Sequence, residues 1–178
     1  MAIGILGGRF DPSHLGHLAL ARTAVERFGL DELHVTVVSD AAHKPSEASA
    51  GHRLAMARLT FAGLDATVEL EEHRYTVDAL EAARYDDPVF LIGADELAAF
   101  PTWKDPERVL ELTRLGVATR PGWEPVGSSE RVEIFELEPH PVSSTEIRER
   151  ARRGESIDDL VVPAVATYIA EHDLYRGT

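Results

Sequence analysis

The chain has 178 residues, with 31 acidic side chains against 18 lysines and arginines and a formal net charge of −13. This acidic excess argues against a general nucleic-acid or anionic-membrane binder, because either would need a basic face. The absence of cysteine excludes disulfides, thiolate metal sites and cysteine nucleophiles. We find no export signal and no apolar run approaching about 18 to 20 residues. We therefore expect a soluble, cytoplasmic protein with a single domain over residues 1–178.

Short apolar runs alternate with segments of helical spacing along the first half of the chain. The expected strands cover residues 3–8, 33–38, 67–70 and 89–92. The expected helices between them cover residues 18–28, 54–64 and 77–84. The second strand is apolar and β-branched, so we expect it to be buried on both faces rather than alternating.

The second half continues the alternation less regularly. We expect a helix near residues 107–112, strands at 115–119 and 132–137, and a helical tail from residue 143. Residues 39–51 and 124–129 are polar or rich in turn residues and are expected to be loops.

Strands and helices in this order imply right-handed crossovers and a parallel sheet with helices on both faces. The expected fold class is therefore α/β, with a single doubly wound, mainly parallel sheet. Ligands of such sheets bind outside the carboxyl ends of the strands, near the point where the strand order reverses. This rule selects three segments that follow strands, at residues 7–17, 39–44 and 93–104.

The first of these segments reads Gly-Gly-Arg-Phe-Asp-Pro-Ser-His-Leu-Gly-His. Two glycines after a strand allow a sharp turn and a close approach by phosphate. His14 and His17 project from one face of a first helical turn, whose free N–H groups and dipole favour an anion. Gly16 between them leaves room for a ligand. Alone, such a pair is more often two partly exposed histidines after a turn. A metal site would need a third ligand, and neither the dinucleotide fingerprint nor a P-loop is present.

A second helix start lies at residues 141–150, Pro-Val-Ser-Ser-Thr-Glu-Ile-Arg-Glu-Arg. Ser143 with Glu146 fits a capping box. The hydroxyl groups, the free N–H groups and the guanidinium of Arg148 suit the pyrophosphate end of a nucleotide. Alone, this segment would be an ordinary capped helix. Two such helix starts in one small acidic domain favour a phosphate-binding site.

Taken together, these segments resemble the nucleotidyltransferase superfamily that carries an H-x-G-H signature. Ile-Gly-Ala-Asp-Glu-Leu at 92–97 and Phe-Pro-Thr-Trp at 100–103 are similar to the bacterial nicotinate-mononucleotide adenylyltransferases. The segments 74–80, 120–122 and 174–176 fit the same family, so the resemblance runs nearly end to end. It implies a Rossmann-like nucleotidyltransferase fold. It also implies transfer of the adenylyl group of ATP, with Mg²⁺, to nicotinate mononucleotide, which gives nicotinate adenine dinucleotide and pyrophosphate in NAD biosynthesis. No covalent enzyme intermediate is expected.

The resemblance also assigns roles to residues. The catalytic residues would be His14, His17 and Arg148. These three would contact ATP together with Gly7, Gly8, Arg9, Phe10, Gly93, Asp95, Ser143 and Thr145. The acceptor would be bound by Lys44 near its phosphate, by Trp103 stacked on the ring, and by Thr76 and the backbone of Lys104 at the ring carboxylate. The family implies no metal ligand among the side chains.

Each acceptor-site role has a plainer alternative without the family. Trp103 could plug a loop, Lys44 could be solvated, and Asp95 or Thr76 could cap a helix.

Three departures from the family pattern concern substrate detail. Arg9 replaces a common threonine or serine and adds a cation beside the phosphates, Arg74 stands beside the presumed ring pocket, and residues 39–42 lack a proline-rich character. Rival functions are the same transfer to nicotinamide mononucleotide or phosphopantetheine, or a non-catalytic nucleotide-binding module. Retention of both histidines and of Arg148 disfavours the module. The sequence leaves a homo-oligomer open.

Overall fold

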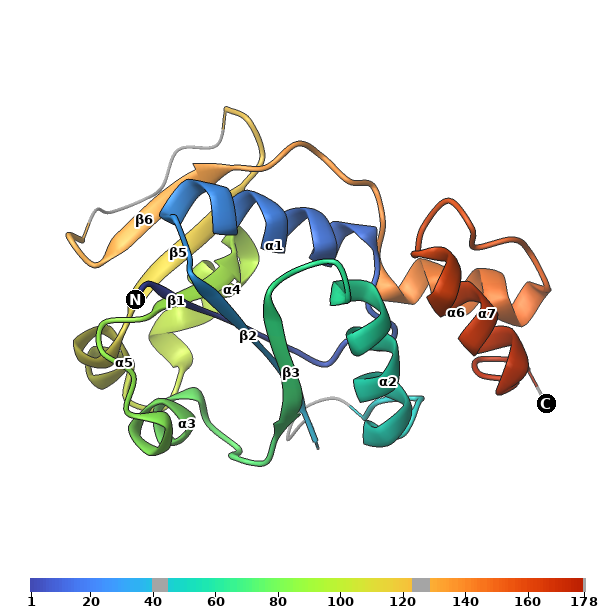
Figure 1. Cartoon of the computed structure of the whole chain (residues 1–178), viewed down its shortest axis with the longest axis horizontal. Coiled ribbons are helices and arrows are strands. Elements are labelled where there is room, and N and C mark those ends of the chain that lie inside the picture. The colour runs from blue at the N-terminus through green and yellow to red at the C-terminus, as the bar shows by residue number, and fades with distance from the viewer. Residues whose placement is uncertain (40–44, 123–128, 178) are drawn as a thin grey trace.

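The computed structural model describes residues 1–39, 45–122 and 129–177. Its strands are β1 (Ile3–Gly8), β2 (Glu32–Val38), β3 (Ala66–Glu71), β4 (Val89–Gly93), β5 (Arg114–Thr119) and β6 (Val132–Glu136). They form one six-stranded sheet in the order β3-β2-β1-β4-β5-β6, and every pairing is parallel (Figure 1). The α/β fold class is confirmed, and the sheet is parallel throughout.

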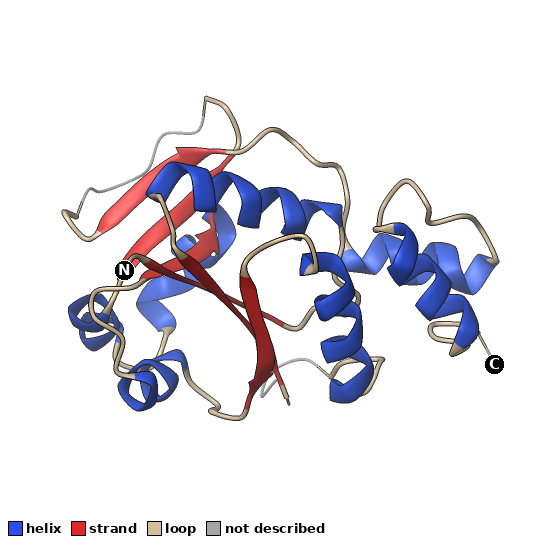
Figure 2. Cartoon of the chain, viewed as in Figure 1, coloured by secondary structure: helices blue, strands red, loops and turns tan. Residues whose placement is uncertain are grey.

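Helices cover both faces of this sheet (Figure 2). They are α1 (Leu15–Phe28), α2 (Ala50–Phe61), α3 (Thr76–Ala83), α4 (Ala94–Ala99), the 3₁₀ helix η1 (Phe100–Thr102), α5 (Pro106–Leu112), α6 (Ser144–Arg153) and α7 (Pro163–Glu171). One core cluster joins α1 and α2 to one face, and a second joins α3, η1 and α5 to the other. Successive residues of a strand therefore pack into opposite clusters. Leu6, for example, belongs to the first cluster and Ile5 to the second. Within the described ranges, no helix is long and apolar enough to cross a membrane.

The last two helices pack outside the sheet. Figure 1 shows α6 and α7 side by side at the end of the molecule where α1 begins. A third core cluster joins Ile147 of α6 and Val165 of α7 to Met56 of α2. The helix α2 is thus packed between the sheet and the C-terminal helices, and this arrangement brings the end of the chain close to the loop after β1.

The sheet opens between β1 and β4, where the strand order reverses. The ladder between these two strands ends at Leu6 and Leu91, although β1 runs on to Gly8 and β4 to Gly93. The last residues of β1 pair only with β2, and those of β4 only with β5. This separation leaves a crevice at the carboxyl edge of the sheet, where ligands of such sheets bind.

Two sequence expectations about this region were wrong. The strand β2 is not fully buried on both faces: Leu33, Val35 and Val37 are buried, whereas His34 and Thr36 are only partly buried. The reason is that His34 and Thr36 line a pocket instead of packing under a helix.

The expected loop at 39–51 ends earlier, because α2 begins at Ala50. The helices α4 and η1 were not predicted, since six and three residues are too few to show a helical period. The loop expected at 124–129 lies almost wholly outside the described residues.

Candidate active site

His14 and His17 hold each other at the start of α1. His14 is the N-cap residue, and its Nδ1 accepts the N–H of His17 at 3.4 Å. In return, Nδ1 of His17 accepts the N–H of His14 at 3.1 Å, and the two rings stack with centroids 3.7 Å apart. Because each Nδ1 is an acceptor, the proton of each neutral ring is on Nε2. Each histidine therefore has one N–H group left to offer a ligand.

Both rings are neutral at physiological pH. Burial lowers the pKa of His14 to about 4, and the charge of His140 contributes to the shift. Burial also lowers the pKa of His17 well below its usual range, with His14 as the second cause. Two neutral N–H donors can bind phosphate oxygens. The protein then carries no buried permanent charge at this position before a phosphate binds.

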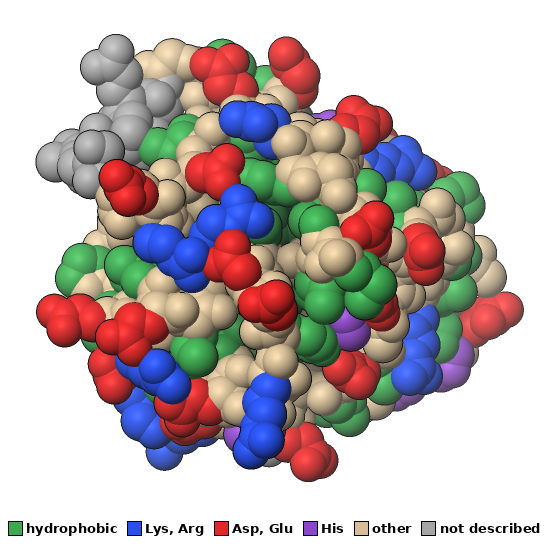
Figure 3. Space-filling model, turned by 60° about the vertical axis from the view of Figure 1, so that its left-hand side comes forward, with side chains coloured by type: hydrophobic (Ala, Val, Ile, Leu, Met, Phe, Trp, Pro, Cys, Tyr) green, Lys and Arg blue, Asp and Glu red, His purple; other side chains and the backbone are tan. Residues whose placement is uncertain are grey.

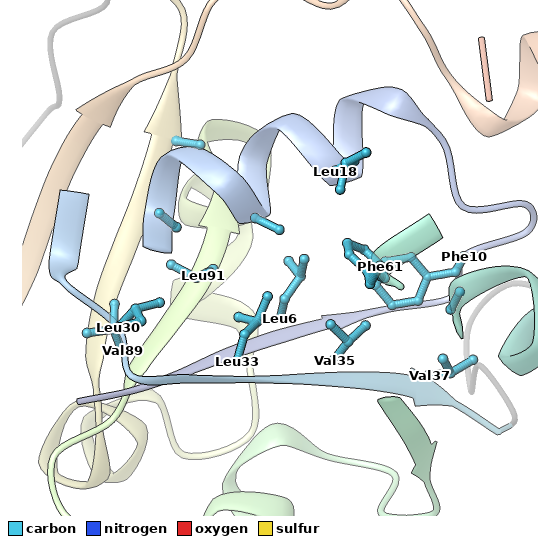
Figure 4. Close-up of a cluster of buried hydrophobic side chains, with 14 of the residues drawn as sticks. Leu6, Phe10, Leu18, Leu30, Leu33, Val35, Val37, Phe61, Val89 and Leu91 are labelled. Carbon is cyan, nitrogen blue, oxygen red and sulfur yellow. The ribbon is translucent and has the colours of Figure 1, made fainter. Parts of the chain in front are cut away.

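Phe10 packs against this histidine pair from the side of the core and does not face the crevice. Its side chain is 2% exposed and lies in the core against Phe61 (Figure 4). Its ring meets that of His17 edge-on, with centroids 4.9 Å apart. The ring of Phe10 therefore supports His17, and binding of ATP by Phe10 stays a prediction.

The start of α6 lies against the start of α1. Ser144 Oγ donates to the carbonyl oxygen of Pro12 at 2.9 Å. A Cβ on Gly16 would come within 3.2 Å of Val142 and 3.1 Å of the His14 ring. A side chain at position 16 would therefore be tight against both neighbours, and Gly16 also lines the larger of the two pockets that flank the opening between β1 and β4, as the expectation that it leaves room for a ligand requires.

The cap of α6 is simpler than predicted. Ser143 Oγ accepts the N–H of Glu146 at 3.2 Å. The carboxylate of Glu146 does not return to Ser143, because it accepts from Arg150 at 2.7 Å. The capping box is therefore only half formed, and the helix start still presents its free N–H groups beside those of α1.

The side chain of Arg148, from α6, is held against the loop before His14. Its Nη1 donates to the carbonyl oxygen of Asp11 at 2.8 Å, and its Nε donates to Glu47 Oε1 at 3.0 Å. Its Nη2 lies 3.4 Å from Thr145 Oγ1. Its side chain is 15% exposed, so the guanidinium is restrained before any ligand arrives.

Two pockets flank the opening between β1 and β4. The larger, about 710 Å³, lies over the ends of β4 and β5 and the segment after β6. Gly16, Gly93, Asp95 and His140 are among its walls. Asp95 belongs to the first turn of α4, whose N-cap is Gly93, so the alternative role of Asp95 as the cap is wrong.

The second pocket, about 360 Å³, lies over the ends of β1 and β2 and beside α3. Gly7, Gly8 and Arg9 form one wall, and Thr76 and Trp103 form another. The two pockets share Glu96 as a lining residue, so they meet beside the strand ends. Burial raises the pKa of Glu96, whose Oε2 accepts the N–H of Gly93 at 2.7 Å.

Trp103 stands at the outer end of the second pocket. Its ring packs edge-on against Phe90 and Phe100, with centroids 6.0 and 5.2 Å apart. It also lines a neighbouring hollow of about 350 Å³ together with Thr76 and Lys104. The ring is therefore supported by the core while it borders two open spaces, as a stacking residue requires.

Lys104 fixes this region to α3. Its Nζ donates to both carboxylate oxygens of Asp78, at 2.7 and 2.9 Å, and lies 4.8 Å from the centre of the Tyr75 ring. Its side chain is thus committed to Asp78, so only its backbone is free for the role expected of it. Thr76 is the first residue of α3 and Tyr75 is the N-cap, which excludes the capping alternative for Thr76.

Charge is mixed over the face of the molecule that Figure 3 shows. On the face in Figure 3, lysines and arginines are interspersed with acidic side chains and do not gather into one basic patch. Within the described part of the chain, no group of three histidine, aspartate or glutamate side chains could hold a metal ion. The groups in the crevice that can attract an anion include the helix starts, the imidazoles and single arginines.

Comparisons with known proteins agree with this geometry. Residues 5–150 match the family model described as cytidylyltransferase-like. Relatives from Bordetella pertussis and Salinibacter ruber, each named "probable nicotinate-nucleotide adenylyltransferase", are 39% and 37% identical. The alignments cover 98% of both chains in the first case and 100% of both in the second. The chain belongs to the nicotinate-nucleotide adenylyltransferase family.

Solved structures of other proteins have the same fold as this chain. The nicotinic acid mononucleotide adenylyltransferase of Plasmodium falciparum complexed with NaAD matches with a TM-score of 0.82 and 18% identity, over 98% of this chain and 97% of that one. The same protein complexed with APC matches with a TM-score of 0.79 and 18% identity, over 98% and 96%. The match at this identity establishes a shared Rossmann-like nucleotidyltransferase architecture.

Most of the residues expected from the sequence meet at one edge of the sheet of this family member. The histidine pair, Arg148, Ser143 and Thr145 lie at the two helix starts. Gly7, Gly8, Arg9, Gly93, Asp95, Thr76 and Trp103 line the two pockets, Lys104 lines the neighbouring hollow, and Phe10 lies in the core. Arg9 is placed differently from expectation, because it lines the pocket that contains Trp103 and not the larger pocket. Lys44 lies outside the described residues, so its role stays a prediction.

The sequence did not indicate one arginine that supports the crevice. Arg53 of α2 is 2% exposed and donates to the carbonyl oxygens of Arg9 at 2.9 Å, Val38 at 2.6 Å, Ser39 at 2.8 Å and Ala48 at 3.2 Å. It thereby ties the ends of β1 and β2 to α2. An arginine among helical residues gives no sign of this role in the sequence.

Proposed function

We propose that this protein transfers the adenylyl group of ATP to nicotinate mononucleotide, giving nicotinate adenine dinucleotide and pyrophosphate. The observation that carries the proposal is the pair of neutral histidines beside a crevice whose two pockets meet at Glu96. One pocket suits each half of a dinucleotide, and full-length relatives carry the corresponding name.

The ATP half of the site would be the larger pocket and the two helix starts. Adenosine would lie along Gly93 and Asp95, and the triphosphate would lie against α1 and α6. There Ser143, Thr145 and Arg148 would hold its oxygens. A phosphate oxygen of the acceptor attacks the α-phosphorus in line, and the bond to pyrophosphate breaks.

The histidines would stabilise this reaction without forming a covalent bond. Nε2–H of His17 and His14 can donate to the oxygens on which charge develops, and both donors are already oriented by their Nδ1 bonds. Oriented donors in a water-poor site contribute most to catalysis when they face developing charge.

Magnesium would accompany ATP. The residues fit this arrangement, because Mg²⁺ at nucleotide sites is held largely by phosphate oxygens and water, with few protein ligands. Asp95, which lines the larger pocket, is one carboxylate that could make such a contact. The ion would neutralise phosphate charge, and the chain's own groups would orient the phosphates.

The acceptor half would be the pocket beside α3. Trp103 would stack on the pyridine ring, and Thr76 with the backbone of Lys104 would bind the ring carboxylate at the positive end of α3. Arg9 borders the same pocket and pairs with no carboxylate among the described residues. We therefore assign Arg9 to the acceptor's phosphate instead of to ATP, with Lys44 as a second cation there.

Replacing Trp103 tests the acceptor half. Trp103→Ala should raise the acceptor KM about 10-fold, because stacking of an aromatic ring contributes on the order of 1–3 kcal/mol. The KM for ATP should stay within about twofold, since the tryptophan does not border the larger pocket. Trp103→Phe should recover most of the loss. An unchanged acceptor KM would remove Trp103 from the binding site.

A further inference from the structure

A buried carboxylate in the loop before His14 is held by the far end of the chain. Asp11 is 3% exposed and accepts three hydrogen bonds. They come from the N–H of Glu47 at 2.7 Å, the N–H of Ala48 at 3.1 Å and the hydroxyl of Tyr175 at 2.7 Å. Within the described ranges Asp11 forms no ion pair, so these neutral donors carry the stabilisation of its charge.

Tyr175 is placed specifically for this bond. Its side chain is 8% exposed, and its backbone adopts a left-handed conformation with φ of 62°. Bulky residues rarely adopt this conformation, and it persists only where the surroundings impose it. Burial, together with the neighbouring Asp11 carboxylate, raises the pKa of Tyr175. The hydroxyl therefore remains protonated and donates.

Asp11 in turn bears on two of the three partners of Arg148, the third being Thr145. Its carbonyl oxygen accepts Nη1 of Arg148 at 2.8 Å. Its carboxylate fixes the backbone of Glu47, whose side chain accepts Nε of Arg148 at 3.0 Å. A shift of Asp11 would move the two closest partners of the guanidinium, along with the loop that leads into His14.

We propose that Tyr175 is a positioning residue for the phosphates of ATP. Its hydroxyl holds Asp11, and Asp11 holds Arg148 in the orientation in which that guanidinium meets the triphosphate. The C-terminal Leu174-Tyr175-Arg176 segment is then part of the ATP site's support as well as of the core. This inference rests on the proposed function in that it takes Arg148 as an ATP ligand.

Removing the hydroxyl alone tests this role. Tyr175→Phe keeps the buried ring and should lower kcat/KM for ATP by about 5- to 20-fold, the range expected when one support of a charged ligand is loosened. The acceptor KM should stay within about twofold. The matched control is Tyr168→Phe, which removes a hydroxyl bonded to His52 Nδ1 at 2.9 Å and so also loosens the contact between α7 and α2. This control should keep kcat/KM for ATP within about twofold of the wild-type value.

A double-variant cycle with Arg148→Ala identifies the route of the effect. If Tyr175 acts through Arg148, Tyr175→Phe should change ATP affinity less than about twofold in that background. Equal losses in the Tyr175 and Tyr168 variants, or a full effect of Tyr175→Phe without Arg148, would overturn the proposal.

Calorimetric titration with ATP separates this inference from the proposed function. If the wild type binds ATP but forms no dinucleotide, the proposed function fails. Weaker ATP binding by Tyr175→Phe, with normal binding by Tyr168→Phe, would still support the positioning role. Equal ATP affinity in all three proteins would contradict it.

Discussion

The neutral state of His14 predicts how the stability of the fold responds to acid. The pKa of His14 falls from its ordinary 6.5 to about 4 on folding. Between these values the unfolded chain binds a proton that the folded chain does not bind. The neutral His14 therefore costs the fold no free energy above pH 6.5. The free energy of unfolding falls as the pH is lowered from 6.5 toward 4.

The size of the effect follows from that shift. Going from pH 7.5 to pH 5, His14 alone should lower the free energy of unfolding by about 2 kcal/mol. The assay is urea unfolding at the two pH values, for the wild type and for His14→Asn. Asparagine is chosen because it is a strong N-cap residue and can still accept the N–H of His17.

The wild type should lose at least about 2 kcal/mol more than His14→Asn over this range, because the variant lacks the titration of His14 and the contribution of His14 to the lowered pKa of His17. Equal losses would show that His14 takes up its proton normally in the fold. In that case the assignment of His14 as a neutral donor with its proton on Nε2 would be refuted.

Two further variants test the histidine pair and the support of the crevice. His17→Ala should lower kcat by about 100-fold or more, because it removes a donor to the developing charge. His172→Ala, on the exposed end of α7, should leave kcat unchanged, and comparable losses in both would contradict the assignment. Arg53→Met should lower the free energy of unfolding by about 3–5 kcal/mol in urea, since it leaves buried carbonyl groups without a donor. Arg58→Met, on the exposed face of the same helix, should cost less than about 1 kcal/mol, and equal effects of the two substitutions would remove Arg53 from its supporting role.

Local patterns predicted the elements that local forces determine. The strand before Gly7, the helix that ends at Gly29 in a left-handed conformation, and the cap at Ser143 were all visible in the sequence. The order of strands and helices was enough to predict the sheet, because crossovers between parallel strands have one hand. The rule that ligands bind at the carboxyl ends of the strands selected the first phosphate-suited helix start. The second was found only from its own residues, and its place beside the first was not predicted.

The remaining features depend on contacts between distant residues. The bond between Asp11 and Tyr175 joins positions 164 residues apart and leaves no local pattern. The alternation of β2 could not be predicted either, because His34 and Thr36 line a pocket instead of packing under a helix. Phe10 was assigned to ATP from its place in a motif, which did not indicate that its buried ring supports His17.

Product analysis tests the central claim most directly. The purified protein is mixed with Mg·ATP and nicotinate mononucleotide, with nicotinamide mononucleotide and phosphopantetheine in parallel reactions. We predict pyrophosphate and nicotinate adenine dinucleotide, formed faster than the product of either other acceptor. A preference for phosphopantetheine, or no dinucleotide from either mononucleotide, would contradict the account.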